Sequence, residues 1–301
     1  MRRVLTTDIS DTRVRAIARA ARFGDRTRCI ECGYTRKLWQ LSDGRWECKR
    51  CGKQFGLLSG TWLARTRFSL PEVYELLFWF ELGLTDHDIV GRVEVPYHRV
   101  HRFFLQLRRA IRVFEDEAIR LLDGEVEVDE TYFGASFENR RAGKRAKLRK
   151  AGKVKRGRGA KDLQHVVFGI YERTDGIVYV DLVADASGAE LKSTLRENVS
   201  IETTVYSDTF RSYRGLDAEF AGHETVSHRA GECVRGTATI NGIEGFWAYA
   251  KERLLRHHGV ADDHFLLNLK EVEYRFNRRD LDQEEFAKHL LQVLLREPHE
   301  V

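Results

Sequence analysis

The chain lacks any long hydrophobic run. No apolar stretch among its 301 residues approaches the roughly 18 residues that a membrane-spanning helix needs. The start, Met1-Arg2-Arg3-Val4, is followed by polar residues and not by the apolar core of a secretion signal. With 42% hydrophobic and 32% charged residues, the composition is typical of a globular protein. We therefore expect a soluble, cytoplasmic protein.

Cysteine is also scarce. The chain has five cysteines, and four of them lie within one 23-residue stretch. Cys29 and Cys32 form one pair, Cys48 and Cys51 form another, and fifteen residues separate the pairs. Each pair can form a tight knuckle, and two knuckles together supply the four sulfur ligands that tetrahedral zinc prefers. The spacing therefore predicts a metal site and not a disulfide framework.

The residues around these pairs predict a zinc ribbon over 28–60. Gly33 and Gly52 follow the second cysteine of each pair, where a knuckle needs a positive φ. Between the pairs, 38–41 and 45–48 flank the turn Asp43-Gly44 and predict a hairpin. We expect the zinc to be structural, because so small a module has little core of its own. Its surface cations suit a phosphate backbone: Arg28, Arg36, Lys37, Lys49, Arg50 and Lys53.

Helical patterns flank the ribbon. Residues 1–27 contain an Ala- and Arg-rich helical segment. Residues 68–122 predict helices that start at Ser69 and Thr85, followed by a basic third helix. A short middle helix before a basic one is typical of a helix-turn-helix DNA-binding region, in which Arg99 and Arg102 would contact DNA. The alternative is a helical linker with a solvated basic face.

Strands begin near residue 123. The predicted order is strands 125–133, 165–172 and 176–184, helix 188–199, strand 203–207, short helix 209–219, strand 223–228 and helix 241–257. A three-stranded meander followed by alternating helices and strands is typical of a ribonuclease H-like domain, here over 123–260. We therefore expect an α/β (α+β) fold with a mixed sheet covered by helices on both faces. Residues 261–301 predict a helical tail.

A basic insertion interrupts the first predicted hairpin. Residues 136–163 hold twelve Lys and Arg against only Glu138 and Asp162. Such a segment repels itself when free and gains order on nucleic acid. We expect Lys144, Arg145 and Lys150 to contact DNA.

Three acidic residues occupy special positions in this domain. Asp129 lies in the first strand, Asp208 ends a later strand, and Glu244 opens a helix after 35 further residues. Lys251 follows Glu244 by seven residues, which places both on one helix face. In a ribonuclease H-like sheet the two strands are neighbours, so Asp129 and Asp208 can meet while the helix brings Glu244 to the rim. Three adjacent carboxylates would repel, and oxygen ligands of this kind favour Mg²⁺ or Mn²⁺.

The third ligand has an alternative. Asn241 lies one turn before Glu244 and can also face the metals. Glu244 is favoured, because a carboxylate neutralises divalent ions better and its spacing to Lys251 fits. We expect Glu127 and Glu130 to lie behind the ligands or in solvent, and Trp247 to be a core residue.

These motifs together resemble the DDE transposases of the ISXO type, a group of insertion-sequence enzymes. The resemblance is carried by the zinc ribbon and by Val128-Asp129-Glu130-Thr131-Tyr132-Phe133-Gly134, Ser207-Asp208, Asn241-Gly242-Ile243-Glu244-Gly245-Phe246-Trp247 with Lys251, and Tyr274-Arg275-Phe276-Asn277-Arg278-Arg279. It implies DNA cleavage at the element's ends and joining of the 3′-hydroxyl to target DNA. Asp129, Asp208 and Glu244 would bind the catalytic metals, and Lys251 would contact a DNA end.

The resemblance also implies partners. They would be double-stranded DNA, as terminal inverted repeats and target, and further copies of the chain, because two ends must be held together. Two other functions stay open from the sequence. One is a sequence-specific DNA-binding regulator with an inert or repurposed transposase domain, and the other is a structure-selective nuclease of the same fold.

Overall fold

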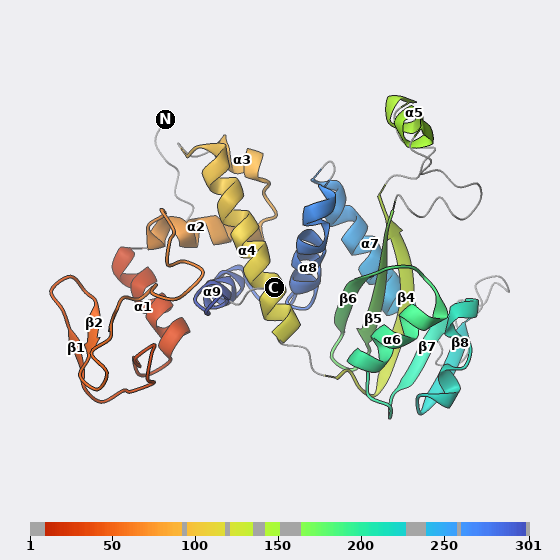
Figure 1. The fold of residues 1–301 in the computed structure, drawn as a ribbon, viewed down its shortest axis with the longest axis horizontal. Helices are drawn as coiled ribbons and strands as arrows, with labels where there is room; N and C mark the ends of the chain where they lie inside the picture. Colours follow the sequence, from red (N-terminus) through yellow and green to blue (C-terminus); the bar gives the residue numbers. More distant parts are fainter. Residues whose placement is uncertain are drawn as a thin grey trace. The chain divides into compact units, whose positions relative to one another are not determined.

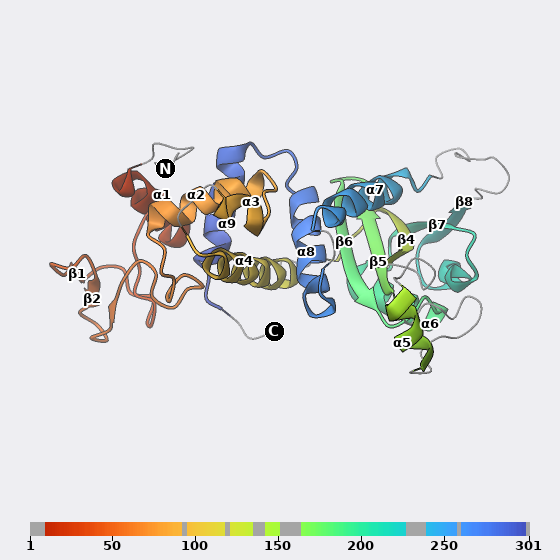
Figure 2. The same cartoon turned by 90° about the horizontal axis from the view of Figure 1, so that it is seen from above.

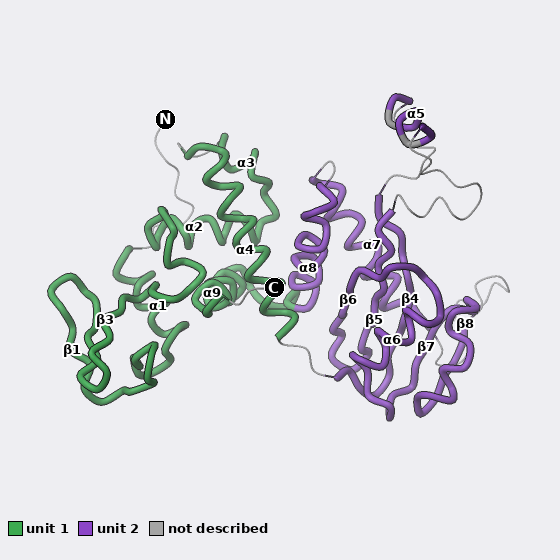
Figure 3. The backbone as a smooth tube through the Cα atoms, in the orientation of Figure 1, with its two compact units in different colours: residues 1–117, 278–301 green, residues 118–277 purple. Residues whose placement is uncertain are grey.

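The computed structural model describes residues 10–91, 95–117, 121–134, 142–150, 164–226, 239–257 and 260–298. The chain forms two compact units, which Figure 3 colours separately. Unit 1 comprises residues 1–117 and 278–301, and unit 2 comprises residues 118–277. The C-terminal segment expected as one tail is therefore divided between the units. Within the described ranges, no helix combines the length and apolar composition needed to cross a membrane.

Unit 1 begins with a helix and a small sheet: α1 (Asp11–Phe23), β1 (Leu38–Gln40), β2 (Trp46–Cys48) and β3 (Gln54–Phe55). The three strands pair antiparallel in the order β1-β2-β3. The predicted hairpin is present, and β3 adds a short third strand that the sequence did not reveal. Phe23 of α1 packs edge-on against Trp46 and Phe55, with ring centroids 6.0 and 6.4 Å away. These rings pack in one small apolar cluster with Ile30 and Leu38.

The other helices of unit 1 are α2 (Leu70–Glu81), α3 (Asp86–Val90), α4 (Tyr97–Glu117) and α9 (Gln283–Leu294). The Ser69 side chain caps α2, while Glu72 accepts from the Ser69 backbone N–H at 2.7 Å. Thr85 and Asp88 cap α3 in the same reciprocal way. Both capping boxes satisfy N–H groups that have no partner inside the helix. The predicted helix starts at Ser69 and Thr85 are confirmed.

Unit 2 is built on a five-stranded sheet with the order β6-β5-β4-β7-β8. The strands are β4 (Glu125–Phe133), β5 (His165–Glu172), β6 (Ile177–Val183), β7 (Thr204–Asp208) and β8 (Gly222–Val226). The first three form an antiparallel meander, whereas β4 with β7 and β7 with β8 are parallel. This is the ribonuclease H-like mixed sheet, so the predicted fold class is confirmed.

Helices cover both faces of this sheet (Figures 1 and 2). They are α6 (Gly188–Asn198) on one face and α7 (Asn241–Leu255) with α8 (Phe265–Phe276) on the other. Val126 and Val128 of β4 pack with Leu191 in the core under α6. Phe133 of the same strand packs with Trp247 in the core under α7 and α8. Because side chains alternate along a strand, the odd-numbered residues of β4 face α7.

Candidate active site

Four cysteine side chains converge in the zinc ribbon. The sulfur atoms of Cys29, Cys32, Cys48 and Cys51 all lie within 4.8 Å of one another. Two of the separations are 3.6 Å, between Cys29 and Cys51, and 3.7 Å, between Cys32 and Cys48. A tetrahedral zinc ion with bonds of about 2.3 Å requires sulfur–sulfur edges of about 3.8 Å. The cluster therefore supports the predicted structural zinc site, and all four thiols are free of disulfides.

The two predicted aspartates lie on neighbouring strands of unit 2. Strands β4 and β7 are parallel, and their register pairs Val128 with Ser207. Asp129 and Asp208 each follow by one position, so they come next to each other on the sheet face that α7 covers. Tyr206, two residues before Asp208, packs into the core on that same face. The strand topology thus brings together two carboxylates that are far apart in the sequence.

Asp129 sits under α7 in a partly buried position. Trp247 donates its indole N–H to Asp129 Oδ2 at 3.0 Å. Gly169 is the residue opposite Asp129 on β5, and a Cβ there would lie 2.6 Å from Trp247 Cζ2. Glycine therefore lets the indole lie against the sheet beside the carboxylate. Burial, and then the charges of Glu130 and Asp208, raise the pKa of Asp129 to about 7.

The end of β7 is held by contacts on both sides of Asp208. The Asp208 Oδ1 atom accepts from the Phe210 backbone N–H at 2.8 Å. The Ser207 hydroxyl donates to the Asp208 carbonyl and lies 2.8 Å from His223 Nε2 on β8. Burial lowers the pKa of His223, so this ring is neutral near pH 7. These hydrogen bonds fix the orientation of the Asp208 carboxylate at the end of β7.

Helix α7 carries the other predicted residues, Asn241, Glu244 and Lys251, and all three are exposed. Glu244 lies in the first turn, three residues before Trp247. Residues three apart lie on one side of a helix, so Glu244 is on the side of α7 that contacts Asp129. Among the described residues, only the four cysteines form a group of three or more potential ligands close enough to share a metal ion. The structure brings Asp129 and Asp208 together and leaves Glu244 outside such a closed group.

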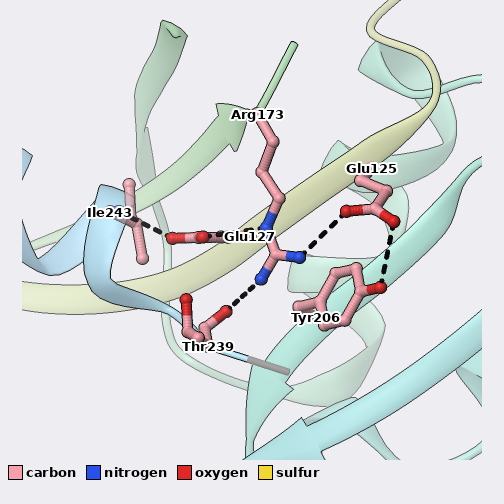
Figure 4. Close-up of polar contacts among 6 residues, drawn as sticks. All are labelled: Glu125, Glu127, Arg173, Tyr206, Thr239 and Ile243. Atoms are coloured by element: carbon pink, nitrogen blue, oxygen red, sulfur yellow. Dashed lines mark hydrogen bonds and ion pairs between the residues drawn. The ribbon is translucent and has the colours of Figure 1, made fainter. Parts of the chain in front are cut away.

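A second acid of β4 has a role that the sequence did not indicate. Glu127 was expected behind the ligands or in solvent, and it is buried. Its carboxylate accepts from Arg173 Nε at 2.9 Å and from the Ile243 backbone N–H at 3.0 Å (Figure 4). The partners lie 46 and 116 positions away in the chain. The residues next to Glu127 in the sequence do not indicate contacts with such distant partners.

The comparison with family models decides the relationship. The model of the ISXO2-like transposase domain matches residues 121–277, just over half of the chain. The chain belongs to the ISXO2-like transposase family. A second model, of a transposase zinc-ribbon domain, matches residues 9–54. Both predicted relationships, to the ISXO-type transposases and to their zinc ribbon, are confirmed.

Two proteins are similar in sequence to this chain. An uncharacterized transposase-like protein of Haemophilus influenzae is 38% identical over 104 residues, which cover 35% of this chain and 84% of that protein. An uncharacterized protein in transposable element ISH50 of Halobacterium salinarum is 28% identical over 235 residues, or 77% and 78% of the two chains.

Among solved structures, the chain is similar to retroviral integrase catalytic cores. A match to the HTLV-2 integrase core in complex with magnesium has 9% identity and a TM-score of 0.30, and covers 52% of this chain and 86% of that one. A match to the BIV integrase core has 10% identity and a TM-score of 0.28, and covers 57% and 82%. The ribonuclease H-like fold of unit 2 follows from its strand order and register.

The cations of this transposase that were predicted to contact DNA have different surroundings. Arg102 on α4 is exposed. Arg99 donates to the Arg67 carbonyl at 3.0 Å, and its guanidinium lies 4.6 Å from the Phe68 ring centroid. Arg99 therefore also holds the segment that precedes α2.

The basic insertion is described only over α5 (Ala142–Lys150). Within this helix Lys150 is exposed and Arg145 is half-buried. The Lys144 side chain and the remainder of 136–163 lie outside the described residues. The predicted DNA contacts of the insertion thus stay predictions.

Proposed function

We propose that the protein is an insertion-sequence transposase that cleaves DNA at the ends of its element and joins the freed 3′-hydroxyl to target DNA. The observation that carries this proposal is the placement of Asp129 and Asp208 on the adjacent parallel strands β4 and β7, within an ISXO2-like transposase domain. Metal-dependent phosphodiester chemistry needs acidic oxygen ligands held rigidly next to each other.

The chemistry of these residues fits divalent cations. Burial and the charges of Glu130 and Asp208 make an ionised Asp129 unfavourable, as the raised pKa of Asp129 indicates. A bound cation relieves such repulsion. Asp129, Asp208 and either Glu244 or Asn241 would hold Mg²⁺ or Mn²⁺. When bound, the ions would supply Lewis-acid activation of the attacking oxygen and stabilisation of the leaving oxygen.

The chain's own residues orient this site. The Trp247 indole N–H donates to Asp129 Oδ2, and this hydrogen bond fixes the rotation of the carboxylate. Glu244 lies in the first turn of α7, and the exposed Lys251 follows two turns later. Lys251 would contact a DNA phosphate. The two aspartates would remain fixed on the sheet while α7 sets the position of the third ligand.

Other parts of the chain would recognise DNA. The zinc ribbon and helices α2, α3 and α4, acting as a helix-turn-helix region with Arg99 and Arg102, would bind the terminal inverted repeats. Lys144, Arg145 and Lys150 of the basic insertion would hold end or target DNA. The protein would act on DNA in the cytoplasm as a homo-oligomer, because two ends must be joined.

The test is a cleavage and strand-transfer assay on the element's own ends with Mg²⁺. Asp129→Asn and Asp208→Asn should each abolish cleavage while binding of the ends is retained. Cleavage by either variant would overturn the assigned site. Tight, specific end binding by the unmodified protein without any metal-dependent cleavage would point to a regulator instead.

The third ligand is tested in the same assay. Glu244→Gln should abolish strand transfer, and Asn241→Ala should retain most of it. If only Asn241→Ala is inactive, Asn241 is the ligand and Glu244 is not.

A further inference from the structure

An ion pair between the buried Glu127 and the half-buried Arg173 joins β4 and β5 to the start of α7. Arg173 directly follows β5, and its Nε donates to Glu127 Oε1 at 2.9 Å. The same guanidinium donates to Glu125 Oε2 at 2.9 Å and to the Thr239 carbonyl, just before α7 (Figure 4). It also lies 3.7 Å from the Tyr206 ring centroid. Arg173 thus connects four segments of unit 2 through one side chain.

The other oxygen of Glu127 caps α7. The residue preceding the helix, Ile240, gives no side-chain cap. Instead, the Ile243 backbone N–H donates to Glu127 Oε2 at 3.0 Å. A carboxylate at a helix N-terminus satisfies an otherwise unpaired N–H and interacts favourably with the helix dipole. Here the cap comes from the strand that also carries Asp129.

Gly242 shows how closely the first turn of α7 packs on the sheet. A Cβ at Gly242 would lie 2.5 Å from Tyr171 Cδ1 and 2.9 Å from Glu127 Oε2. A Cβ at Gly245, three residues later, would meet no atom within 4 Å. Gly242, in the turn next to Glu127, therefore has no room for a side chain, whereas Gly245 has.

We propose that Glu127 and Arg173 are positioning residues that set where α7 presents the third metal ligand. Glu127 precedes Asp129 by two residues on the same sheet face, and Asn241 and Glu244 flank the capped Ile243. Whichever of the two serves as ligand, the Glu127 cap fixes its distance from the aspartates. The inference rests on the proposed function, since it assigns the metal site to these residues.

The first test measures Mn²⁺ binding to the full chain, without DNA, in Glu127→Gln and Arg173→Gln. Loss of a supporting contact to a metal site weakens binding by about 10- to 100-fold. A positioning role predicts weaker binding in both variants. A purely electrostatic role predicts opposite effects, because one variant removes a negative charge and the other a positive charge. Opposite effects, or unchanged binding in both, would overturn the proposal.

A matched control uses another ion-paired acid of unit 2. Glu219 contacts Lys192 at 3.3 Å and Arg196 at 2.8 Å. Glu219→Gln removes the same charge as Glu127→Gln and should leave Mn²⁺ affinity unchanged. An equal loss in Glu219→Gln would attribute the effect to net charge and contradict the positioning role.

The second test needs neither metal nor activity. Amide hydrogen exchange of residues 241–246 should become faster in Glu127→Gln and Gly242→Ala, and should be unchanged or slower in Gly245→Ala. This readout stays valid even if Asp129→Asn proves able to cleave DNA, so failure of the proposed function and failure of the positioning role are distinguishable. Unchanged exchange in Glu127→Gln would show that the cap does not hold the turn. Faster exchange with unchanged Mn²⁺ affinity would overturn the positioning role.

Discussion

The zinc ribbon and the proposed acidic site of unit 2 are built on different principles. The four cysteines converge within a 23-residue stretch, and Gly33 and Gly52, with φ of +68° and +74°, close their knuckles. The acids lie on two strands and a helix, and contacts such as that of Trp247 with Asp129 span 118 positions.

The two sites differ in the sequence separation of their residues, and therefore in what holds those residues together. The cysteine cluster is encoded locally, and its metal stabilises the module that holds it. The proposed acidic site would depend on the packing of α7 on β4 and β5, and a bound cation would relieve the repulsion among its carboxylates. The first region should therefore lose its fold without metal, whereas the second should keep its fold and lose only activity.

The largest expected effect is the loss of zinc. Cys48 is fully buried in the cluster, so Cys48→Ser removes a ligand with no replacement. Because zinc supplies about 10 kcal/mol or more to the folding of small zinc modules, we expect the ribbon to unfold. Zinc content and limited proteolysis of residues 28–60 would measure this, and unit 2 should stay protected. A protease-resistant ribbon without zinc would contradict the local account.

Replacing the Asp129 carboxylate should stabilise the sheet. Without divalent ions, Asp129 has a pKa raised to about 7 by burial and by Glu130 and Asp208. The folded state then binds a proton that the unfolded state has lost, so the stability of unit 2 should fall as pH rises from about 4 to 7. Asp129→Asn should remove this slope and raise the free energy of unfolding by about 4 kcal/mol at pH 7. Hydrogen exchange of β4 and β5 in urea would measure it; an unchanged slope would refute the crowding.

The packing of α7 on the sheet can be disturbed by a substitution on β5, the strand that pairs with β4. Gly169→Ala would place a Cβ 2.6 Å from Trp247 and 2.8 Å from Ile243 Cδ1. We expect a loss of about 2 kcal/mol in the free energy of unfolding, since such overpacking forces side chains or backbone to shift. Gly245→Ala, in open space on α7, is the control and should be neutral or slightly stabilising. Equal unfolding midpoints in urea for the two variants would show that α7 is not packed on Gly169.

The smallest expected effect comes from one hydrogen bond. Trp247→Phe keeps an aromatic ring and removes the N–H that Asp129 Oδ2 accepts. We expect cleavage to slow by about tenfold, in line with about 1–1.5 kcal/mol for one such contact. The loss should appear in kcat and not in KM for DNA. A change confined to KM would place Trp247 in DNA binding instead.

Much of this architecture could be predicted from the sequence. The predicted strand 125–133 matches β4, and the order of elements predicted that Asp129 and Asp208 would lie on neighbouring strands. Cysteine spacing predicted the zinc ribbon, and capping residues such as Ser69 predicted the helix starts. Both are local signals. These features depend on periodicity and short-range chemistry, which a single sequence contains.

Other features depend on contacts between distant residues. The two-residue strand β3 is too short for a periodic signal. The placement of α9 in unit 1 follows from tertiary packing, and a linear pattern of apolar residues does not specify a partner. Glu127 has the same local appearance as Glu125, and both accept hydrogen bonds from Arg173. Only the burial of Glu127 and its hydrogen bond from the distant Ile243 backbone N–H distinguish it.

The central claim is that Asp129 and Asp208 form one metal site. Anomalous diffraction from crystals of the full chain grown with Mn²⁺ tests it most directly. A shared metal site predicts manganese density in contact with carboxylate oxygens of both residues, and loss of that density in Asp129→Asn. Manganese bound elsewhere in unit 2, with neither aspartate among its ligands, would contradict the account.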